Sequence, residues 1–410
     1  MNVSPNFSPP ISLMKPYFTL SSLFYMLSML LLFFINPFSD LKDFSLLAWV
    51  HLYMLGFVMM GIFAAMAQLA PIVIETNHYS IKVFKYLHIF LVSGLLLLLY
   101  GFLQNTLFLL FGGGLVFVAM LIYALEFLLT LKNAQRKTSI TKAMKMSNLF
   151  LLLGIITGLV MASAFNGLIN INPDTILNIH TFGLVVGFVI LLIMGISIIL
   201  IPMFGSAKRI SDNEFSNSFI SLSLAVLVMM LSVFFYTYIL EKLSYGISTL
   251  AILLYFYQLF KMTSSRKRIT HDIWAKSMYV AFGSFFISFI LLLLYIFTQN
   301  DILLALGMWI MFVGFFGFVI IGNFYKVVPF LVWFHIYSPL IETQVVPMLH
   351  ELLPKKLSLL QWIYSLFGLI LTSVGLYMQD LTLFHGGALL LFVGGVLFFA
   401  SIKHILNTNK

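Results

Sequence analysis

The sequence GFVMMGIFAAMAQLAP at residues 56–71 begins with Gly-Phe and ends with Pro, and this frame occurs twice more in the chain. The other copies are GFVILLIMGISIILIP at 187–202 and GFFGFVIIGNFYKVVP at 314–329. The distance from Gly to Pro is the same in every copy, and the copies start at nearly equal intervals along the chain. This spacing predicts three similar units in tandem.

The composition indicates a membrane protein. Of the 410 residues, 61% are hydrophobic and 9% are charged, whereas soluble domains carry about 25% charged residues. The apolar runs are long and continuous, which favours membrane helices over the alternating pattern of a β-barrel. The chain has no Cys, so thiolate metal sites, iron–sulfur clusters and disulfides are excluded.

The predicted fold class is an all-α integral membrane protein with about twelve transmembrane helices in three quasi-equivalent four-helix units. We expect one membrane domain over 1–410, with repeat units near 17–131, 146–265 and 275–405. The Gly-Phe…Pro helix is the second of each unit. The hydropathy pattern predicts helices at 17–36, 46–71, 85–103, 105–130, 146–168, 177–203, 217–240, 246–261, 275–298, 302–330, 358–377 and 382–405.

Charge predicts the orientation. Of 22 Lys and Arg residues, only Lys42 and Lys242 fall on the side of the short links near 104, 300 and 380, and the remaining 20 fall on the other side. The positive-inside rule places the basic side and both termini in the cytoplasm, for a multi-pass protein of the cell inner membrane. The segment before Lys15 is a poor signal peptide, so we expect the first helix to be retained. The net charge of +9 follows from this topology and does not indicate nucleic-acid binding.

Two histidines are the main candidates for cofactor binding. His51 and His180 lie near the outer ends of the second and sixth predicted helices, and His180 stands two positions further from its repeat Gly than His51 does. On undistorted helices, two positions correspond to about 200°, so the two imidazoles would face opposite sides. A neutral imidazole can ligate haem (heme) iron or copper, or hydrogen-bond a neighbour as a structural residue. Both interpretations stay open for both histidines.

Other residues are weaker candidates. His385 opens the last helix and is a possible metal ligand, although its Gly-rich surroundings favour packing. Met308 is a candidate axial haem ligand, because it lies on the outer part of the tenth helix at the level of His51. Glu126 is the main acidic residue inside a predicted helix, and an acid at the membrane interface is the simpler interpretation. Loop and cytoplasmic residues that we expect to be solvated offer a further, weak metal-site candidate: Glu75, His78, His335 and His350.

The chain resembles subunit I of the haem–copper oxidase superfamily. That family has twelve helices in three quasi-equivalent sets of four, with metal ligands on helices 2, 6, 7 and 10. The resemblance implies that His51 matches the position of a low-spin haem ligand and that His180 matches a copper ligand. The stretch HLYMLGFVMMGIFAAMAQLAP at 51–71 is similar to the second helix of small catalytic subunits of the cbb3 type.

The chain departs from that family's pattern at two helices. Residues 217–240 contain no His where the family has two, and 302–330 contain none where the family has one. A complete binuclear haem–copper centre is therefore not expected. The NnrS family of haem- and copper-containing membrane proteins also has about this length, but its His-rich second helix is absent here.

These observations leave three functional hypotheses. The first is an oxidase-like membrane protein that binds haem or copper and serves in electron transfer, metal-centre assembly or the nitrosative-stress response. The second is a metal-free transporter or assembly scaffold. The third, an active terminal oxidase, requires unconventional ligands. Besides the lipid bilayer, the expected partners are other respiratory-chain or assembly subunits.

Overall fold

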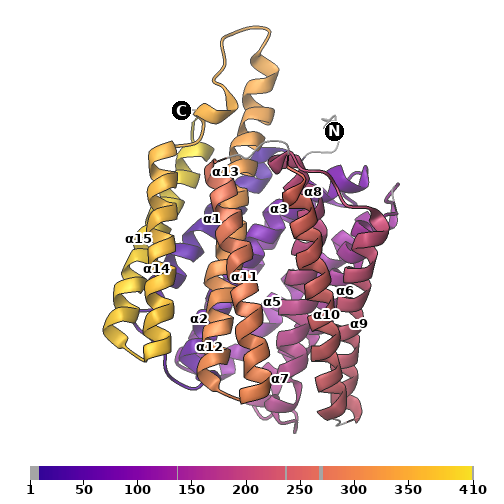
Figure 1. Cartoon of the computed structure of the whole chain (residues 1–410), viewed down its shortest axis with the longest axis vertical. Coiled ribbons are helices and arrows are strands. Elements are labelled where there is room, and N and C mark those ends of the chain that lie inside the picture. The colour runs from indigo at the N-terminus through magenta and orange to yellow at the C-terminus, as the bar shows by residue number, and fades with distance from the viewer. Residues whose placement is uncertain (1–8, 136, 236–237, 267–270, 409–410) are drawn as a thin grey trace. The chain divides into compact units, whose positions relative to one another are not determined.

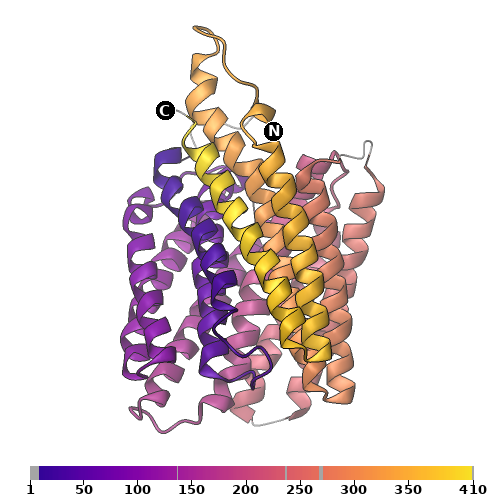
Figure 2. The same cartoon turned by 90° about the vertical axis from the view of Figure 1, so that its left-hand side faces the viewer.

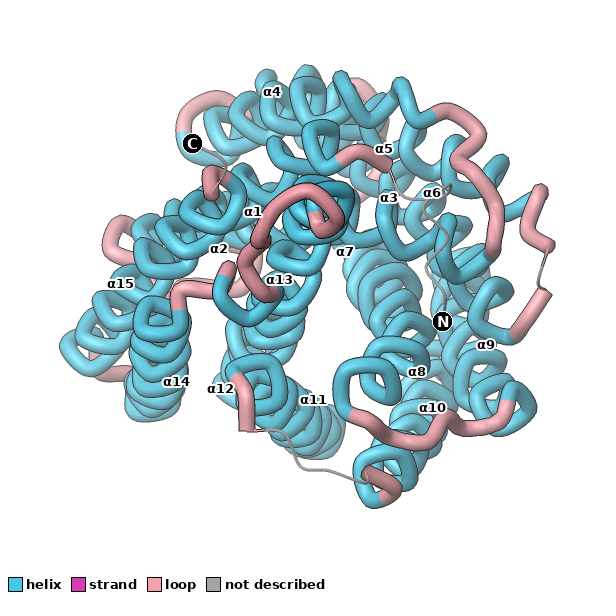
Figure 3. Tube along the Cα trace, turned by 90° about the horizontal axis from the view of Figure 1, so that it is seen from above, coloured by secondary structure: helices cyan, strands magenta, loops and turns pink. Residues whose placement is uncertain are grey.

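The computed structural model describes residues 9–135, 137–235, 238–266 and 271–408. Within these ranges every regular element is a helix and none is a strand, as Figure 3 shows. Eleven helical segments from Phe44 onward are long and apolar enough to cross a membrane. The prediction of an all-α protein with many apolar helices of membrane-spanning length is confirmed.

The helices correspond one for one to the twelve predicted spans (Figure 1). Three spans are compound helices, in which a π segment (η) separates two α segments. The bounds are α1 (Ile11–Leu31), α2–η2–α3 (Phe44–His51, Leu52–Met59, Met60–Ile74), η3–α4 (Ile81–Val83, Phe84–Leu103), α5 (Leu107–Lys132), α6 (Ser139–Phe165), α7–η4–α8 (Pro173–Phe182, Gly183–Ile190, Leu191–Gly205), α9 (Asp212–Phe235), α10 (Tyr238–Ser264), α11 (Ile273–Thr298), α12–η5–α13 (Asp301–Trp309, Ile310–Phe316, Gly317–Val332), α14 (Lys355–Met378) and α15 (Leu381–Leu406).

Three predicted helix starts are wrong by six to eight residues, and one of them is that of α6, which begins at Ser139 and not at 146. The first helix begins at Ile11 and includes Pro16, although the prediction starts it after this proline. The eighth helix begins at Tyr238, well before the predicted start at 246. Glu241 and Lys242, predicted to lie in a loop, are therefore near the start of α10. An acid is favourable at a helix N-terminus, and the Lys242 ammonium lies 4.4 Å from the centre of the Tyr238 ring.

The tenth span extends far beyond the predicted membrane segment. The helix continues from α13 through η6 (Trp333–Tyr337) and η7 (Ser338–Leu340), and one further turn, η8, forms at Leu349–Glu351. The segment Asp301–Leu340 has 40 residues, which is roughly 60 Å of helix and about twice the hydrocarbon thickness of a bilayer. Beyond the predicted membrane segment, the chain therefore forms a helical extension with a returning loop, seen above α13 in Figure 1.

The three compound helices are those that carry the Gly-Phe…Pro pattern, and each has its π segment at the Gly-Phe pair. A π segment hydrogen-bonds from residue i to i+5 and changes the helical register. The predicted opposite facing of His51 and His180 assumes undistorted helices, and this assumption is wrong. The three helices are also the most buried: 72–78% of their apolar windows is buried, against 28–50% in the other eight spans.

The glycine of each copy allows close packing of the preceding helix. A Cβ added at Gly56 would lie 2.7 Å from the Phe24 ring on α1, and one at Gly187 would lie 3.0 Å from Phe150 on α6. A Cβ at Gly314 would lie 2.6 Å from the Ser284 hydroxyl on α11. Real Cβ contacts of this length are sterically forbidden or tight, so each glycine fixes the same kind of helix–helix contact.

Two helix hairpins, α4–α5 and α14–α15, pack backbone against backbone through matching glycines. A Cβ at Gly112 would lie 2.5 Å from the Leu98 nitrogen, and one at Gly387 would lie 2.5 Å from the Thr372 nitrogen. The glycines at 94 and 101 on α4 correspond to those at 368 and 375 on α14, with the same separation within each pair. Figure 2 shows α14 and α15 side by side along their length. Small residues are the usual means of close helix approach in membranes.

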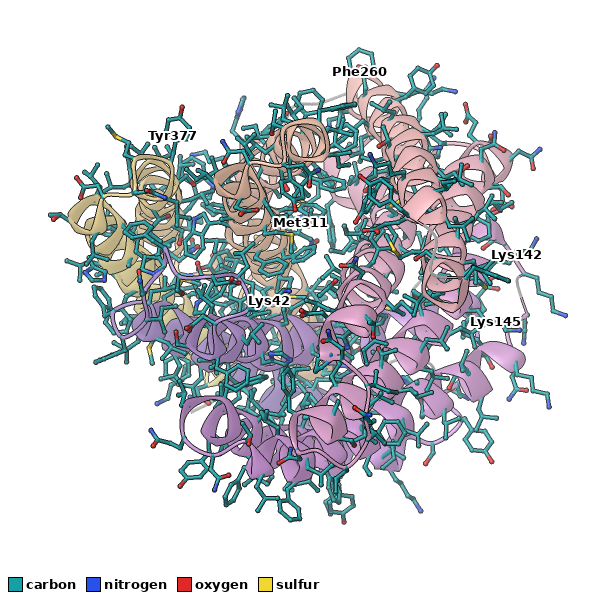
Figure 4. The ribbon with its side chains drawn as sticks, turned by 90° about the horizontal axis from the view of Figure 1, so that it is seen from below. Lys42, Lys142, Lys145, Phe260, Met311 and Tyr377 are labelled. Atoms are coloured by element: carbon teal, nitrogen blue, oxygen red, sulfur yellow. The ribbon has the colours of Figure 1, made fainter. Side chains whose placement is uncertain are left out.

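The contacts divide the chain into two compact units. One contains Gln68–Thr270, and the other contains Pro9–Ala67 with His271–Lys410. The surfaces of both units expose large apolar side chains, which is expected for helices in lipid. Examples in Figure 4 are Phe260 on α10 and Tyr377 on α14, which project outward. The three predicted repeat units stay a prediction, because this division follows contacts and not internal similarity.

Asp43 caps the helix that carries His51. Its carboxylate accepts a hydrogen bond from the Ser45 backbone nitrogen at 2.8 Å and another from the Ser45 hydroxyl. These two bonds hold the pKa of Asp43 below its usual range. Because the folded-state pKa is the lower one, the stabilisation is complete above the unfolded value of about 3.9 and is lost as the pH falls through the folded value.

We therefore expect Asp43→Ala to lower the free energy of unfolding by about 1 kcal/mol at neutral pH, the typical value of an N-cap. Asp43→Asn is the matched control, because its amide oxygen can still accept the backbone bond. Denaturant unfolding in detergent micelles, followed by helical circular dichroism, measures both variants. Equal stability of Asp43→Ala and wild type would show that the cap contributes nothing.

Candidate metal ligands and a buried histidine–glutamate pair

His51 is the last residue of α2 and is half-buried. Its Nδ1 atom lies 2.8 Å from the carbonyl oxygen of Leu47, one turn earlier. A carbonyl can only accept, so Nδ1 must carry the hydrogen. In the neutral ring the lone pair then resides on Nε2, which is the arrangement of many metal-ligating histidines.

His180 lies on α7 and shows the same ring arrangement. Its Nδ1 is 3.0 Å from the Gly154 carbonyl oxygen on α6 and 3.4 Å from the Thr157 hydroxyl. The ring rests against Gly158, where an added Cβ would lie 2.8 Å from Cε1 of the imidazole. Two glycines one turn apart on α6 therefore position this histidine: Gly154 through its carbonyl oxygen, and Gly158 through the absence of a side chain.

The part of α12 where the resemblance to an oxidase predicts a ligand is occupied by packed residues. Met308 is half-buried, and the next residue, Trp309, is buried. The Trp309 indole nitrogen donates a 3.0 Å hydrogen bond to the Thr372 hydroxyl. The carbonyl oxygen of Gly307 accepts a 2.7 Å bond from Ser288. These bonds anchor α12 to α14 and α11.

A stack of aromatic side chains, which we call the aromatic cluster, joins the second and tenth spans. Trp49 stacks on Trp309 with ring centres 5.3 Å apart and on Tyr53 at 5.4 Å. The Tyr53 hydroxyl donates a 2.8 Å bond to the Phe312 carbonyl oxygen. His51 lies two positions from Trp49, about 200° around the α-helix, and is therefore on the other side of α2 from Trp49.

His385 lies on α15 between two phenylalanines. Its ring centre is 5.6 Å from that of Phe33 and 6.2 Å from that of Phe384. The Nε2 atom is buried and has no hydrogen-bond partner among the residues that the structure describes. The surroundings are those of a packed aromatic ring.

No group of three or more His, Asp and Glu side chains within the described ranges is arranged to hold a metal ion. The candidate set of Glu75, His78, His335 and His350 is thus not gathered in these ranges. The interpretation of His78 as a solvated loop residue is wrong, because its side chain is only 3% exposed.

His78 instead pairs with Glu126, and the sequence does not predict this pairing. The His78 Nδ1 atom lies 3.0 Å from Glu126 Oε1, and the Glu126 side chain is 2% exposed. The predicted position of Glu126 at the membrane interface stays a prediction, and its carboxyl group is buried within the protein. Glu126 and Thr130 are one turn apart and so share one face of α5. This spacing is the one feature of the sequence that indicates a polar site on this helix.

Comparisons with known proteins assign this chain to no family. No family model matches the sequence, and no curated protein matches it. The function is therefore argued from the side chains and their surroundings.

Proposed function

We propose that the chain is a membrane protein similar to haem–copper oxidase subunit I, and that it binds haem or copper at His51, with His180 as a further candidate ligand. It would serve in electron transfer, metal-centre assembly or the nitrosative-stress response. The observation that carries this proposal is the shared geometry of the two histidines. Each has Nδ1 on a backbone carbonyl and lies shortly before the repeat Gly of a π-interrupted, buried helix.

Four features support a threefold arrangement of the oxidase type. The repeat pattern falls on three deeply buried helices. All three carry a π segment at the Gly-Phe pair, and each repeat glycine contacts the helix before it. Gly-matched hairpins occur as the last two helices of the first and third units. The charge distribution would place the basic loops and both termini in the cytoplasm and the histidines towards the outer face.

The residues present fit separate single-metal sites better than a binuclear centre. His51 could hold haem iron or copper through Nε2, His180 could hold copper, and Met308 could supply a further ligand to iron. When bound, such a group supplies one-electron chemistry. The chain's contribution is to fix the imidazole orientation through the Leu47 and Gly154 carbonyls.

The binuclear centre of an oxidase does not fit. Neither α9 nor the segment Asp301–Val332 contains a His. Trp309 occupies the part of the tenth span where a ligand would be expected, and it donates a hydrogen bond to Thr372. We therefore expect no oxygen uptake by the purified chain in the presence of an artificial electron donor. Polarographic uptake above that of empty micelles would show that an active oxidase site is present.

One observation favours a metal-free scaffold or transporter as the second candidate. The aromatic cluster is packed and hydrogen-bonded at the level where a tenth-helix ligand would lie. A scaffold would use these helices for packing alone.

A haem titration distinguishes a cofactor-binding protein from a metal-free scaffold, because only a cofactor site gives an absorbance that saturates with added haem.

The titration adds haem to purified protein in detergent and follows the Soret absorbance. We expect a red-shifted band that saturates at one haem per chain. Empty micelles provide the control for haem that merely dissolves in detergent. An absorbance rise that never saturates, equal to that of empty micelles, would contradict haem binding, and the same titration with copper tests the other metal.

A further inference from the structure

The loop between α3 and α4, residues 75–80, is fastened to the buried face of α5 by hydrogen bonds to two side chains. His78 Nδ1 lies 3.0 Å from Glu126 Oε1, and the Ser80 backbone nitrogen donates to the same oxygen at 3.4 Å. The Tyr79 backbone nitrogen donates to the Thr130 hydroxyl at 2.9 Å. The Thr130 hydroxyl in turn donates to Glu126 Oε1 at 2.8 Å.

The two carboxyl oxygens of Glu126 differ sharply in their surroundings. Oε1 accepts from Thr130 and Ser80 and contacts the His78 ring nitrogen, which donates when Oε1 carries no proton. Oε2 is buried and has no hydrogen-bond partner among the described residues. A buried oxygen without a donor is far more costly when it carries charge than when it is part of a neutral group.

Among the described residues, the neighbouring elements bring little compensating charge. On α5 itself, Tyr123 is buried one turn before Glu126, and α4 carries the half-buried His88. Glu75, a further acid, begins the loop. The basic groups on η3, α4, α5 and α6 all lie outside the buried core, namely Lys82, Lys85, Lys132, Lys142 and Lys145. Figure 4 shows Lys142 and Lys145 projecting away from the helices.

We propose that Glu126 and His78 form a buried proton-binding site, with the exchangeable proton on Oε2 of Glu126. In the bound state the carboxyl group is neutral, Oε1 keeps its donors, and the loop 75–80 stays fastened to α5. Release of the proton to water leaves a carboxylate that requires hydration at Oε2. Hydration requires the loop to open, so proton occupancy and loop closure are linked.

A proton-binding role explains why two polar residues, His78 and Glu126, lie among otherwise apolar packed side chains. Ionisable groups inside a membrane protein mark proton or ion pathways more often than structure. The ligand here is a proton, since a metal ion would need further side-chain ligands and no such group is gathered in the described ranges. The site does not depend on His51 or on any cofactor.

Infrared difference spectroscopy of the full chain in lipid nanodiscs tests the proposal. We expect a pH-dependent C=O stretch of a protonated carboxylic acid, and its complete loss in Glu126→Gln. Thr130→Val removes one donor to Oε1 and leaves Oε2 intact, so the band should persist at a higher frequency. If Glu126 stays ionised over the whole pH range, neither wild type nor Thr130→Val would show a band of a protonated acid.

Hydrogen exchange of the amides at 76–80 supplies the second readout. We expect opening to increase with pH more steeply in wild type than in Glu126→Gln, whose neutral amide cannot release the proton. The proposal would be overturned by a carboxylate signal without an acid band at every pH at which the chain is folded. That result indicates a permanent ion pair. The His51→Ala background separates this result from cofactor binding, since the acid band should be unchanged there.

Discussion

Replacement of His51 by alanine is expected to abolish the Soret band of the purified protein. The imidazole is oriented by a 2.8 Å bond to the Leu47 carbonyl, and alanine offers no ligand in its place. Loss of an axial imidazole removes the protein's bond to the metal, so the residual binding should equal partition into the micelle. Optical spectra of wild type and variant at equal protein concentration measure the effect.

His404→Ala is the control for this experiment. His404 lies in the last turn of α15 and is exposed, so its replacement should leave the spectrum unchanged. His180→Ala should reduce bound copper while leaving haem absorbance in place. If His51→Ala retained the full band, the assignment of His51 as a haem ligand would be wrong.

The second large effect is expected from Gly112→Ala in the α4–α5 hairpin. The new methyl group would lie 2.5 Å from the Leu98 nitrogen and 2.8 Å from the Gly94 carbonyl oxygen. Both are backbone atoms, so the helices must separate, and we expect a loss of about 3 kcal/mol of unfolding free energy, at the upper end of overpacking effects. Denaturant unfolding in mixed micelles is the measurement.

Gly114→Ala on the same helix is the matched control. No heavy atom lies within 4 Å of a Cβ added at Gly114, and alanine is favoured over glycine in a helix by about 1 kcal/mol. This variant should be as stable as wild type or more so. Equal stabilities of the two alanine variants would show that the close approach of α4 and α5 is not rigid.

The repeat pattern predicts three corresponding helices because its residues act through local geometry. A glycine and a later proline at a fixed spacing mark a long helix that others approach closely, and all three copies lie on the most buried helices. The twelve helical spans follow from hydropathy. The predicted α9–α10 turn is misplaced because Glu241 and Lys242 are tolerated within the first turns of a helix.

The π segments could not be predicted from this sequence. An insertion into the helical register depends on how a helix packs against its neighbours, and no residue type in the Gly-Phe pairs specifies it. The error affects function directly, because the predicted direction of each histidine rests on ideal helical spacing.

The His78–Glu126 pair escapes prediction for a related reason. The two residues are separated by 48 positions, and one of them lies in a loop that hydropathy marks as polar. Only the folded arrangement shows that this loop turns back onto α5. Polar residues at 126 and 130 on one helical face give a partial signal, and it indicates an acid at the membrane interface equally well.

The haem and copper content of the wild-type chain, purified from membranes in mild detergent, tests the central claim most directly. We expect a reduced-minus-oxidised difference spectrum with haem bands, or copper at a fixed ratio to the chain by elemental analysis. A purified, folded chain with neither haem bands nor copper would contradict the proposed cofactor site and favour the metal-free scaffold.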